Sequence, residues 1–145
     1  MTRTVFVLNG PNINLLGKRE PGIYGDMTLA AIEKACREEA QSIGFQIDFR
    51  QTNHEGMLVD WLHEADDAAA GVAINPGAYG HTSIALHDAV RSISIPVVEL
   101  HISNIHAREE FRHKSMIAPA AKGMICGFGP DSYLLALRAL KNLTE

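Results

Sequence analysis

The chain has 145 residues, near the common length of one globular domain, and 46% of them are hydrophobic while 21% are charged. This composition is too apolar for a disordered chain, and the length suffices to bury a core without disulfides or a metal. Thirteen basic and seventeen acidic residues give a formal net charge of −4. This balance argues against general binding to nucleic acids or anionic membranes, although a local basic pocket is compatible with it.

Neither the cysteines nor the chain start has the pattern of an exported protein. Cys36 and Cys126 lie far apart in apolar segments, and we expect both to be buried free thiols. Residues 1–4 lead directly into a strand-like run, without the longer apolar region of a signal peptide. No run reaches the roughly 18 apolar residues needed to span a bilayer. We therefore expect a cytoplasmic protein with neither membrane nor nucleic acid as a partner.

Short apolar runs flanked by Gly, Pro or Asn recur along the chain. They cover residues 5–8, 72–74, 97–98 and 124–126. Uninterrupted runs of this length are typical of strands covered on both faces, as in a parallel sheet. Phe45, Ile47 and Phe49 instead alternate with polar residues, which predicts an edge strand with one face in water.

Helical patterns separate these runs. The first predicted helix carries its apolar stripe at Leu29, Ile32, Cys36, Ala40 and Ile43. Thr28 is its expected N-cap and Gly44 its expected stop. Helical spacing recurs at Leu58, Trp61, Leu62 and Ala65, and at Leu134, Leu137 and Leu140. The latter group marks a terminal helix opened by Asp131, and a further helix is predicted over residues 83–92, before Pro96.

The alternation of these elements predicts a single α/β domain over residues 1–145. Its core is a flavodoxin-like, open five-stranded parallel sheet with helices on both faces. Ligands of such sheets bind beyond the carboxyl ends of the strands. Polar and glycine clusters follow four of the predicted strands, at residues 9–12, 75–77, 101–104 and 127–129. We therefore expect the functional site at this rim.

Three groups of short motifs lie in these loops. They are NGPN (9–12), GKREP (17–21) and YG (24–25), then NPGAY (75–79) and HTS (81–83), and finally ELHISN (99–104) and AREEFR (107–112). In this order and spacing they resemble the type II dehydroquinases over nearly the whole chain. Members of that family often carry a hydroxyl residue at Gly80, an arginine at His87 and a glycine at Ser132. The His87 departure bears on the contacts of the adjacent Asp88.

The resemblance implies a hydro-lyase that acts on a small molecule, 3-dehydroquinate. Water is lost by anti elimination through an enolate to give 3-dehydroshikimate, with no metal or cofactor. The expected role is in the shikimate pathway toward chorismate and aromatic amino acids, and quinate breakdown is the alternative. The resemblance also implies a homo-oligomer, in which trimers assemble into dodecamers.

Removal of a proton beside a ketone requires a base, a donor for the enolate and an acid for the departing hydroxyl. The resemblance assigns the base to Tyr24, on a loop rich in Gly and Pro that suits a lid. An ordinary phenol pKa of about 10 is too high, but the cations of Arg19 and Arg108 can favour tyrosinate. The alternative is an exposed loop tyrosine with solvated arginines.

His101 is the expected acid, and Glu99, two positions earlier on the same side of an extended segment, is expected to orient its ring. The alternative is a surface Glu–His pair at a strand end. Asn12 can hold a water or donate toward the enolate oxygen, unless it serves only the geometry of the turn. Arg112 lies four residues after Arg108, so on a helix the two would share a face.

The remaining site residues are expected to bind the substrate. Arg112 can hold its carboxylate in a bidentate fork, unless it pairs with Glu109 or Glu110. The resemblance assigns the other contacts with the ring hydroxyls and the carboxylate to Asn75, His81 and the backbone donors of Ile102 and Ser103. The alternative for His81 is helix capping. Asp88 is expected to reach a neighbouring subunit's site, or else to be a simple surface aspartate.

Other functions fit the sequence less well. The seven histidines raise the possibility of a metal site, but they show no standard ligand spacing. A flavodoxin-like, non-catalytic ligand-binding module would suit the fold, yet residues 9–12 lack a hydroxyl-rich and glycine-rich phosphate cradle. A protein that kept the fold and lost activity is disfavoured by the complete set of Arg19, Tyr24, His101 and Arg112.

Overall fold

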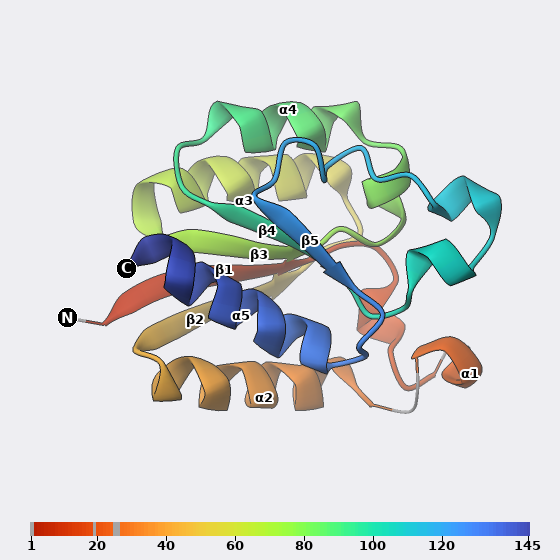
Figure 1. The fold of residues 1–145 in the computed structure, drawn as a ribbon, viewed down its shortest axis with the longest axis horizontal. Coiled ribbons are helices and arrows are strands. Elements are labelled where there is room, and N and C mark those ends of the chain that lie inside the picture. The colour runs from red at the N-terminus through yellow and green to blue at the C-terminus, as the bar shows by residue number, and fades with distance from the viewer. Residues whose placement is uncertain (1, 19, 25–26) are drawn as a thin grey trace.

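The computed structural model describes residues 2–18, 20–24 and 27–145, with residue 24 described by its backbone alone. Within these residues, five parallel strands form one sheet in the order β2-β1-β3-β4-β5 (Figure 1). The strands are β1 (Arg3–Asn9), β2 (Phe45–Gln51), β3 (Gly71–Asn75), β4 (Val97–His101) and β5 (Gly123–Cys126). The helices are α1 (Pro21–Tyr24), α2 (Leu29–Ser42), α3 (Glu55–Ala68), α4 (Ile84–Ser92) and α5 (Asp131–Thr144). Short 3₁₀ helices cover Ile13–Leu15, Gly77–His81, Ile105–Ala107 and Glu110–Arg112.

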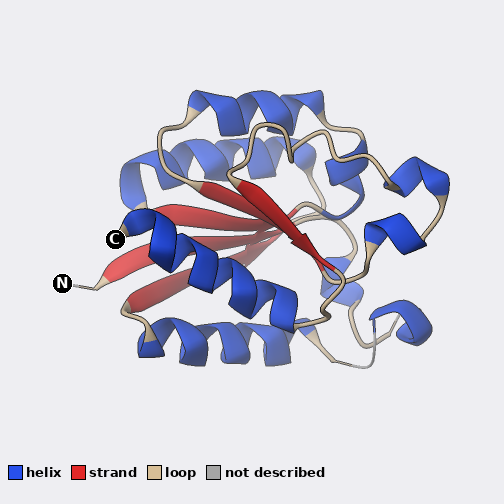
Figure 2. Cartoon of the chain, in the orientation of Figure 1, coloured by secondary structure: helices blue, strands red, loops and turns tan. Residues whose placement is uncertain are grey.

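The helices cover both faces of the sheet, as Figure 2 shows, with α2 and α5 on one face and α3 and α4 on the other. This is the predicted flavodoxin-like α/β arrangement, so the fold class is confirmed. The register pairs Asn9 at the end of β1 with Asn75 at the end of β3, so the loops that follow start side by side. No helix in the described ranges is long and apolar enough to cross a bilayer.

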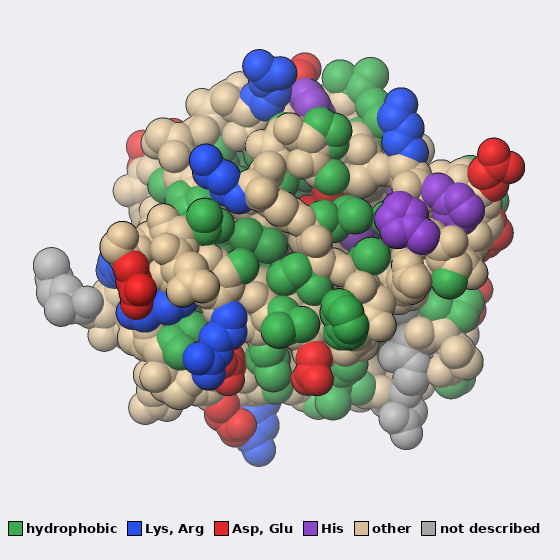
Figure 3. Space-filling view, viewed as in Figure 1, with side chains coloured by type: hydrophobic (Ala, Val, Ile, Leu, Met, Phe, Trp, Pro, Cys, Tyr) green, Lys and Arg blue, Asp and Glu red, His purple; other side chains and the backbone are tan. Residues whose placement is uncertain are grey.

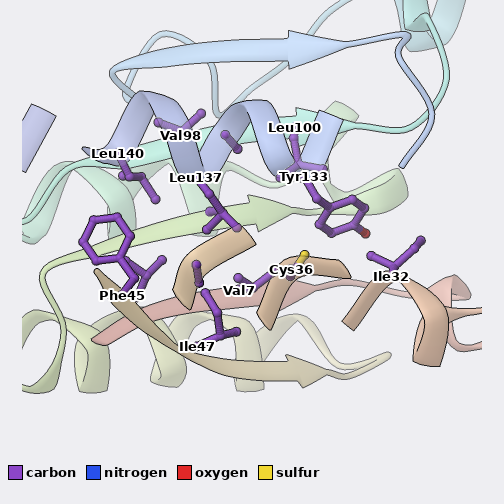
Figure 4. Packing of buried hydrophobic residues seen from close by; sticks show 14 of the residues in the cluster. Val7, Ile32, Cys36, Phe45, Ile47, Val98, Leu100, Tyr133, Leu137 and Leu140 are labelled. Carbon is purple, nitrogen blue, oxygen red and sulfur yellow. The ribbon is translucent and has the colours of Figure 1, made fainter. Parts of the chain in front are cut away.

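Two apolar clusters hold the layers together. Successive side chains of a strand point to opposite faces, so the continuous apolar run in β1 serves both clusters. Val5 and Val7 join the cluster with α2 and α5, whereas Phe6 and Leu8 join the one with α3 and α4. Figure 4 shows the first cluster, to which α5 contributes Leu137. Burial of each such side chain stabilises the fold by about 1.5–3 kcal/mol relative to exposure.

The helix ends lie where the sequence predicts them. Thr28 caps α2 by accepting a 3.2 Å hydrogen bond from the backbone N–H of Ala31. Gly44 follows the end of α2 with a φ of 87°, a left-handed conformation that glycine adopts without strain. Ser83 caps α4 in the same manner, accepting from the N–H of Leu86 at 2.9 Å.

The two edges of the sheet differ. β2 forms one edge, as predicted, with Gln46 exposed and Ile47 buried. β5 forms the other, and its residues are exposed or only partly buried. The expectation that residues 124–126 are covered on both faces is therefore wrong. Hydrophobic side chains lie on the surface over β5 and α5 (Figure 3), because β5 ends the sheet. Cys36 is a buried free thiol, as expected, but Cys126 is free and only partly buried.

Glycines bring two rim loops into contact. A Cβ at Gly10 would collide with the carbonyl oxygen of Pro76, so only glycine fits where the loop after β1 meets the loop after β3. The N–H of Gly10 donates to the carbonyl of Asn75 at 2.8 Å. Gly77 has a φ of 60°, and a Cβ there would lie 3.2 Å from the carbonyl oxygen of Pro11. The glycines of both motifs thus determine the shape of the rim.

Candidate active site

A cleft of about 130 Å³ lies beyond the carboxyl ends of the central strands. The predicted residues that line it are Asn12, Asn75, His81, His101, Ile102, Ser103, Arg108 and Arg112. These residues come from the carboxyl ends of β3 and β4 and from the loops after β1, β3 and β4, so the expected convergence on one rim is present (Figure 1). A small polar cleft with two arginines suits a small molecule that bears an anionic group.

Glu99 and His101 form a pair at the end of β4. Nε2 of His101 lies 2.5 Å from Oε2 of Glu99. Glu99 is fully buried and His101 is 5% exposed, so the alternative of a surface Glu–His contact is wrong. Residues two apart on a strand share a face, which is why the spacing predicts the contact. A buried hydrogen bond to a carboxylate is strong, and it holds the imidazole in one orientation.

His81 stacks on His101, with ring centroids 5.7 Å apart and planes inclined by 19°. Burial lowers the pKa of His81, and the nearby His101 and Arg112 lower it further, whereas the contact with the Lys114 carbonyl raises it. Nδ1 of His81 lies 3.0 Å from that carbonyl oxygen, which only accepts, so Nδ1 carries the proton. A neutral His81 therefore retains Nε2 as an acceptor for a hydroxyl. The alternative role of helix capping belongs to Ser83.

The lowered pKa of His81 predicts how pH affects substrate binding. KM should stay constant as pH falls to 6.5, the ordinary histidine pKa, and rise only below it, when Nε2 becomes protonated and cannot accept. His81→Gln, which does not titrate, should lack this rise, whereas a wild-type rise centred on the ordinary value would contradict the assignment. Because the unfolded chain binds this proton first, His81 should also lower the free energy of unfolding as pH falls below that value.

The amide of Asn75 is held from two sides. Its Oδ1 accepts from the N–H of Gly77 at 3.2 Å, and its Nδ2 donates to the hydroxyl of Tyr133 at 2.9 Å. The Tyr133 hydroxyl in turn donates to Oδ1 of Asn9 at 2.6 Å. Burial raises the pKa of Tyr133, so its phenol stays neutral and can donate. Tyr133, seen in the apolar cluster of Figure 4, thus links α5 to the end of β3.

Arg108 and Arg112 both line the cleft, but not from one helix. Arg108 is extended, with φ −108° and ψ −165°, and separates two 3₁₀ helices, the second of which ends at Arg112. The expected shared helix face is therefore wrong, since an extended residue interrupts the helical geometry. Nη1 of Arg108 lies 3.4 Å from the hydroxyl of Ser103. Nε of Arg112 donates to Oε1 of Glu109 at 3.2 Å. Arg112 therefore pairs with Glu109 and also lines the cleft, so pairing and substrate binding are not exclusive alternatives.

Asn12 shapes the turn after β1 and also lines the cleft. It has a φ of 69° and a ψ of −4°, in the left-handed region that Asn tolerates better than most residues. Its backbone N–H donates at 3.0 Å to Oδ1 of Asn53, which follows β2. The turn geometry is therefore observed, and the exposed Asn12 side chain remains at the cleft.

Two predicted residues of the lid are not placed. Arg19 and the side chain of Tyr24 lie outside the described residues. α1, which ends at residue 24, lies near the cleft, because Ile23 lines a neighbouring groove together with Arg108, which also lines the cleft. Asp88 is exposed on α4 and is not among the residues that line the cleft within this chain.

Histidine side chains also gather on the surface near the 3₁₀ helices, as Figure 3 shows. The rings of His106 and His113 lie 6.0 Å apart and are tilted by 52°. Across residues 2–18, 20–24 and 27–145, no three His, Cys, Asp or Glu side chains are grouped as metal ligands.

The fold and the cleft define a flavodoxin-like α/β protein with a small polar site at the carboxyl rim of its sheet. The family model described as Dehydroquinase class II matches residues 3–141. The 3-dehydroquinate dehydratase of Rhizobium meliloti (strain 1021) is 75% identical over 145 residues, which cover 100% of this chain and 98% of the relative. The solved type II dehydroquinase of Propionibacterium acnes is 42% identical, with a TM-score of 0.94 over 98% of each chain. The chain belongs to the class II dehydroquinase family.

Proposed function

We propose that the protein catalyses the anti dehydration of 3-dehydroquinate to 3-dehydroshikimate in the cytoplasm, without a metal or cofactor. The observation that carries this proposal is the buried Glu99–His101 pair, which opens onto a cleft with two arginines. The name of the 75% identical relative, which this chain matches along its whole length, supports the same reaction. The role proposed is in the shikimate pathway toward chorismate and aromatic amino acids.

The elimination proceeds in two steps. Tyr24, as tyrosinate supported by the cations of Arg19 and Arg108, takes the proton beside the ketone, and the electron pair moves onto the carbonyl oxygen. Asn12, directly or through a water, donates toward the resulting enolate oxygen. When the enolate collapses, the C–O bond to the β-hydroxyl breaks. His101 gives this hydroxyl its proton, and water leaves.

The other cleft residues orient the substrate. Its carboxylate fits the backbone N–H groups of Ile102 and Ser103 together with the guanidinium of Arg112. Ring hydroxyls donate to Nε2 of His81 and contact the amide of Asn75, whose orientation is held by its own hydrogen bonds. Because these groups are fixed before the substrate binds, little ordering cost remains for catalysis.

The direct test is the appearance of ultraviolet absorbance from the conjugated product when purified protein is mixed with 3-dehydroquinate. His101→Ala protein supplies the matched control for contaminating activity. No absorbance change from folded wild-type protein would refute the proposed reaction. A yellow, flavin-bearing preparation without turnover would support the flavodoxin-like binding module instead.

We also propose that the protein is a homo-oligomer, with trimers that assemble into dodecamers and Asp88 of one subunit completing a neighbour's site. Asp88 is exposed on α4, and Ile84 at the start of the same helix is 60% exposed. A contact between subunits would cover this large apolar side chain. His87 is held within its own chain, since its Nδ1 contacts the carbonyl oxygen of Met116 at 2.7 Å.

Mixing two inactive variants tests the shared site. Tyr24→Phe and Asp88→Ala chains should regain part of the wild-type turnover when refolded together, because a complete site can form with one group from each chain. Tyr24→Phe mixed with His101→Ala should regain none, because both groups belong to one chain's site. Absence of recovery in oligomers verified to contain both Tyr24→Phe and Asp88→Ala chains would rule out the shared site.

A further inference from the structure

Ser115 lies in the loop before β5 and contacts the buried carboxylate at the end of β4. Its Oγ lies 2.7 Å from Oε1 and 2.9 Å from Oε2 of Glu99. Building on the acid role proposed for His101, we propose that Ser115 is a positioning residue for the reaction. It holds the Glu99 carboxylate as a hydrogen-bond acceptor and thereby keeps the ring proton of His101 on Nε2.

The backbone partners of Ser115 determine the direction of its hydrogen bond. A hydroxyl has one proton to donate and two lone pairs with which to accept. The N–H groups of Ile117 and Ala118 donate to Oγ at 3.1 and 3.0 Å. These two donors occupy both lone pairs, so the hydroxyl proton is directed at Glu99.

This donation determines the proton arrangement of the Glu99–His101 pair. A carboxylate that accepts from Ser115 also accepts from the nearest ring nitrogen, which is Nε2 of His101 at 2.5 Å. Nε2 therefore carries a proton in every state of the ring, and Nδ1 is the nitrogen that takes up and releases the catalytic proton. Loss of the Ser115 donor leaves the carboxylate free to rotate, and the imidazole loses its fixed orientation.

No neighbouring side chain described in the structure takes the place of Ser115. A Cβ at Gly80 would lie 3.5 Å from Oε2 of Glu99 and 3.2 Å from Cε1 of His101, but glycine brings no donor to this space. His81 stacks on His101 and directs its Nδ1 at a backbone carbonyl. In the described ranges, Ser115 and His101 are the side chains placed within hydrogen-bonding distance of this carboxylate.

Ser115→Ala tests the assignment with two readouts. It should lower kcat by roughly 10- to 100-fold, the factor expected for a hydrogen bond to a buried charged group. KM should change little, since Ser115 does not line the cleft. In histidine-labelled wild-type protein, Nε2 of His101 should carry a low-field proton resonance, identified by its loss in His101→Ala. This resonance should be shifted or lost in Ser115→Ala and restored, together with kcat, in Ser115→Thr.

Ser94→Ala is the matched control, because the Ser94 hydroxyl also donates to a carboxylate, that of Asp66, at 2.9 Å. Ser94 precedes β4, whereas His101 lies at the opposite end of this strand. Ser94→Ala should change neither kcat nor the resonance. If Ser115→Ala does not fold, Ser115→Cys carries the same test, since a thiol is a weak donor.

An unchanged His101 resonance in folded Ser115→Ala would overturn the positioning role, even if kcat fell. An unchanged kcat would overturn it as well. Wild-type protein that shows the Ser115-dependent resonance but does not dehydrate 3-dehydroquinate would refute the proposed function, while supporting a proton on Nε2 of His101.

Discussion

Replacement of His101 with alanine should lower kcat by at least about a hundredfold, the scale expected when a positioned acid is lost. The substitution removes the proton donor for the departing hydroxyl. It also leaves the fully buried carboxylate of Glu99 without its ring partner, which costs about 1–3 kcal/mol of stability. Turnover with 3-dehydroquinate should therefore be measured together with thermal unfolding, at a temperature where the variant is folded.

His54→Ala and His63→Ala are the controls for this loss. His54 precedes α3 and His63 lies on it, and both side chains are exposed and outside the cleft. Both variants should retain near-normal turnover. Equal losses in all three variants would mean that histidine substitution destabilises the protein, and would remove the support for His101 as the acid.

Local periodicity is sufficient to predict the layers of this fold but not how far each strand is covered. The apolar runs at residues 5–8 and 72–74 are buried, because β1 and β3 lie between other strands. The run at residues 124–126 looks the same in sequence, yet it forms an edge strand that is only partly buried. A hydrophobic run indicates that its side chains favour burial, whereas strand order depends on contacts between residues that are far apart in the chain.

The site could be predicted to a similar extent. Asn12, Asn75 and His101 lie at or just after the carboxyl ends of three different strands, and the rule for parallel sheets brings them to one rim without knowledge of their contacts. Ser115 and Tyr133 could not be predicted in this way. Their hydrogen bonds join residues 16 and 58 positions apart, and nothing in a loop serine or a helical tyrosine identifies such a partner.

Replacement of Tyr24 with phenylalanine should lower kcat by at least about a hundredfold, because the change removes the group assigned as the base and little else. The cost to folding should be small. The preceding residues of α1, Pro21, Gly22 and Ile23, are all exposed, so this segment contributes little to the core. Thermal unfolding of Tyr24→Phe should therefore match that of the wild type, and KM should change far less than kcat.

Tyr79→Phe provides the matched loss of a hydroxyl. The Tyr79 hydroxyl donates to the backbone carbonyl of Asn53 at 2.9 Å, near the rim but outside the residues that line the cleft. This variant should keep near-normal turnover, since only one exposed hydrogen bond is lost. If folded Tyr24→Phe also kept near-normal turnover, Tyr24 would not be the base. The proton beside the ketone would then have to be removed by another group at the rim.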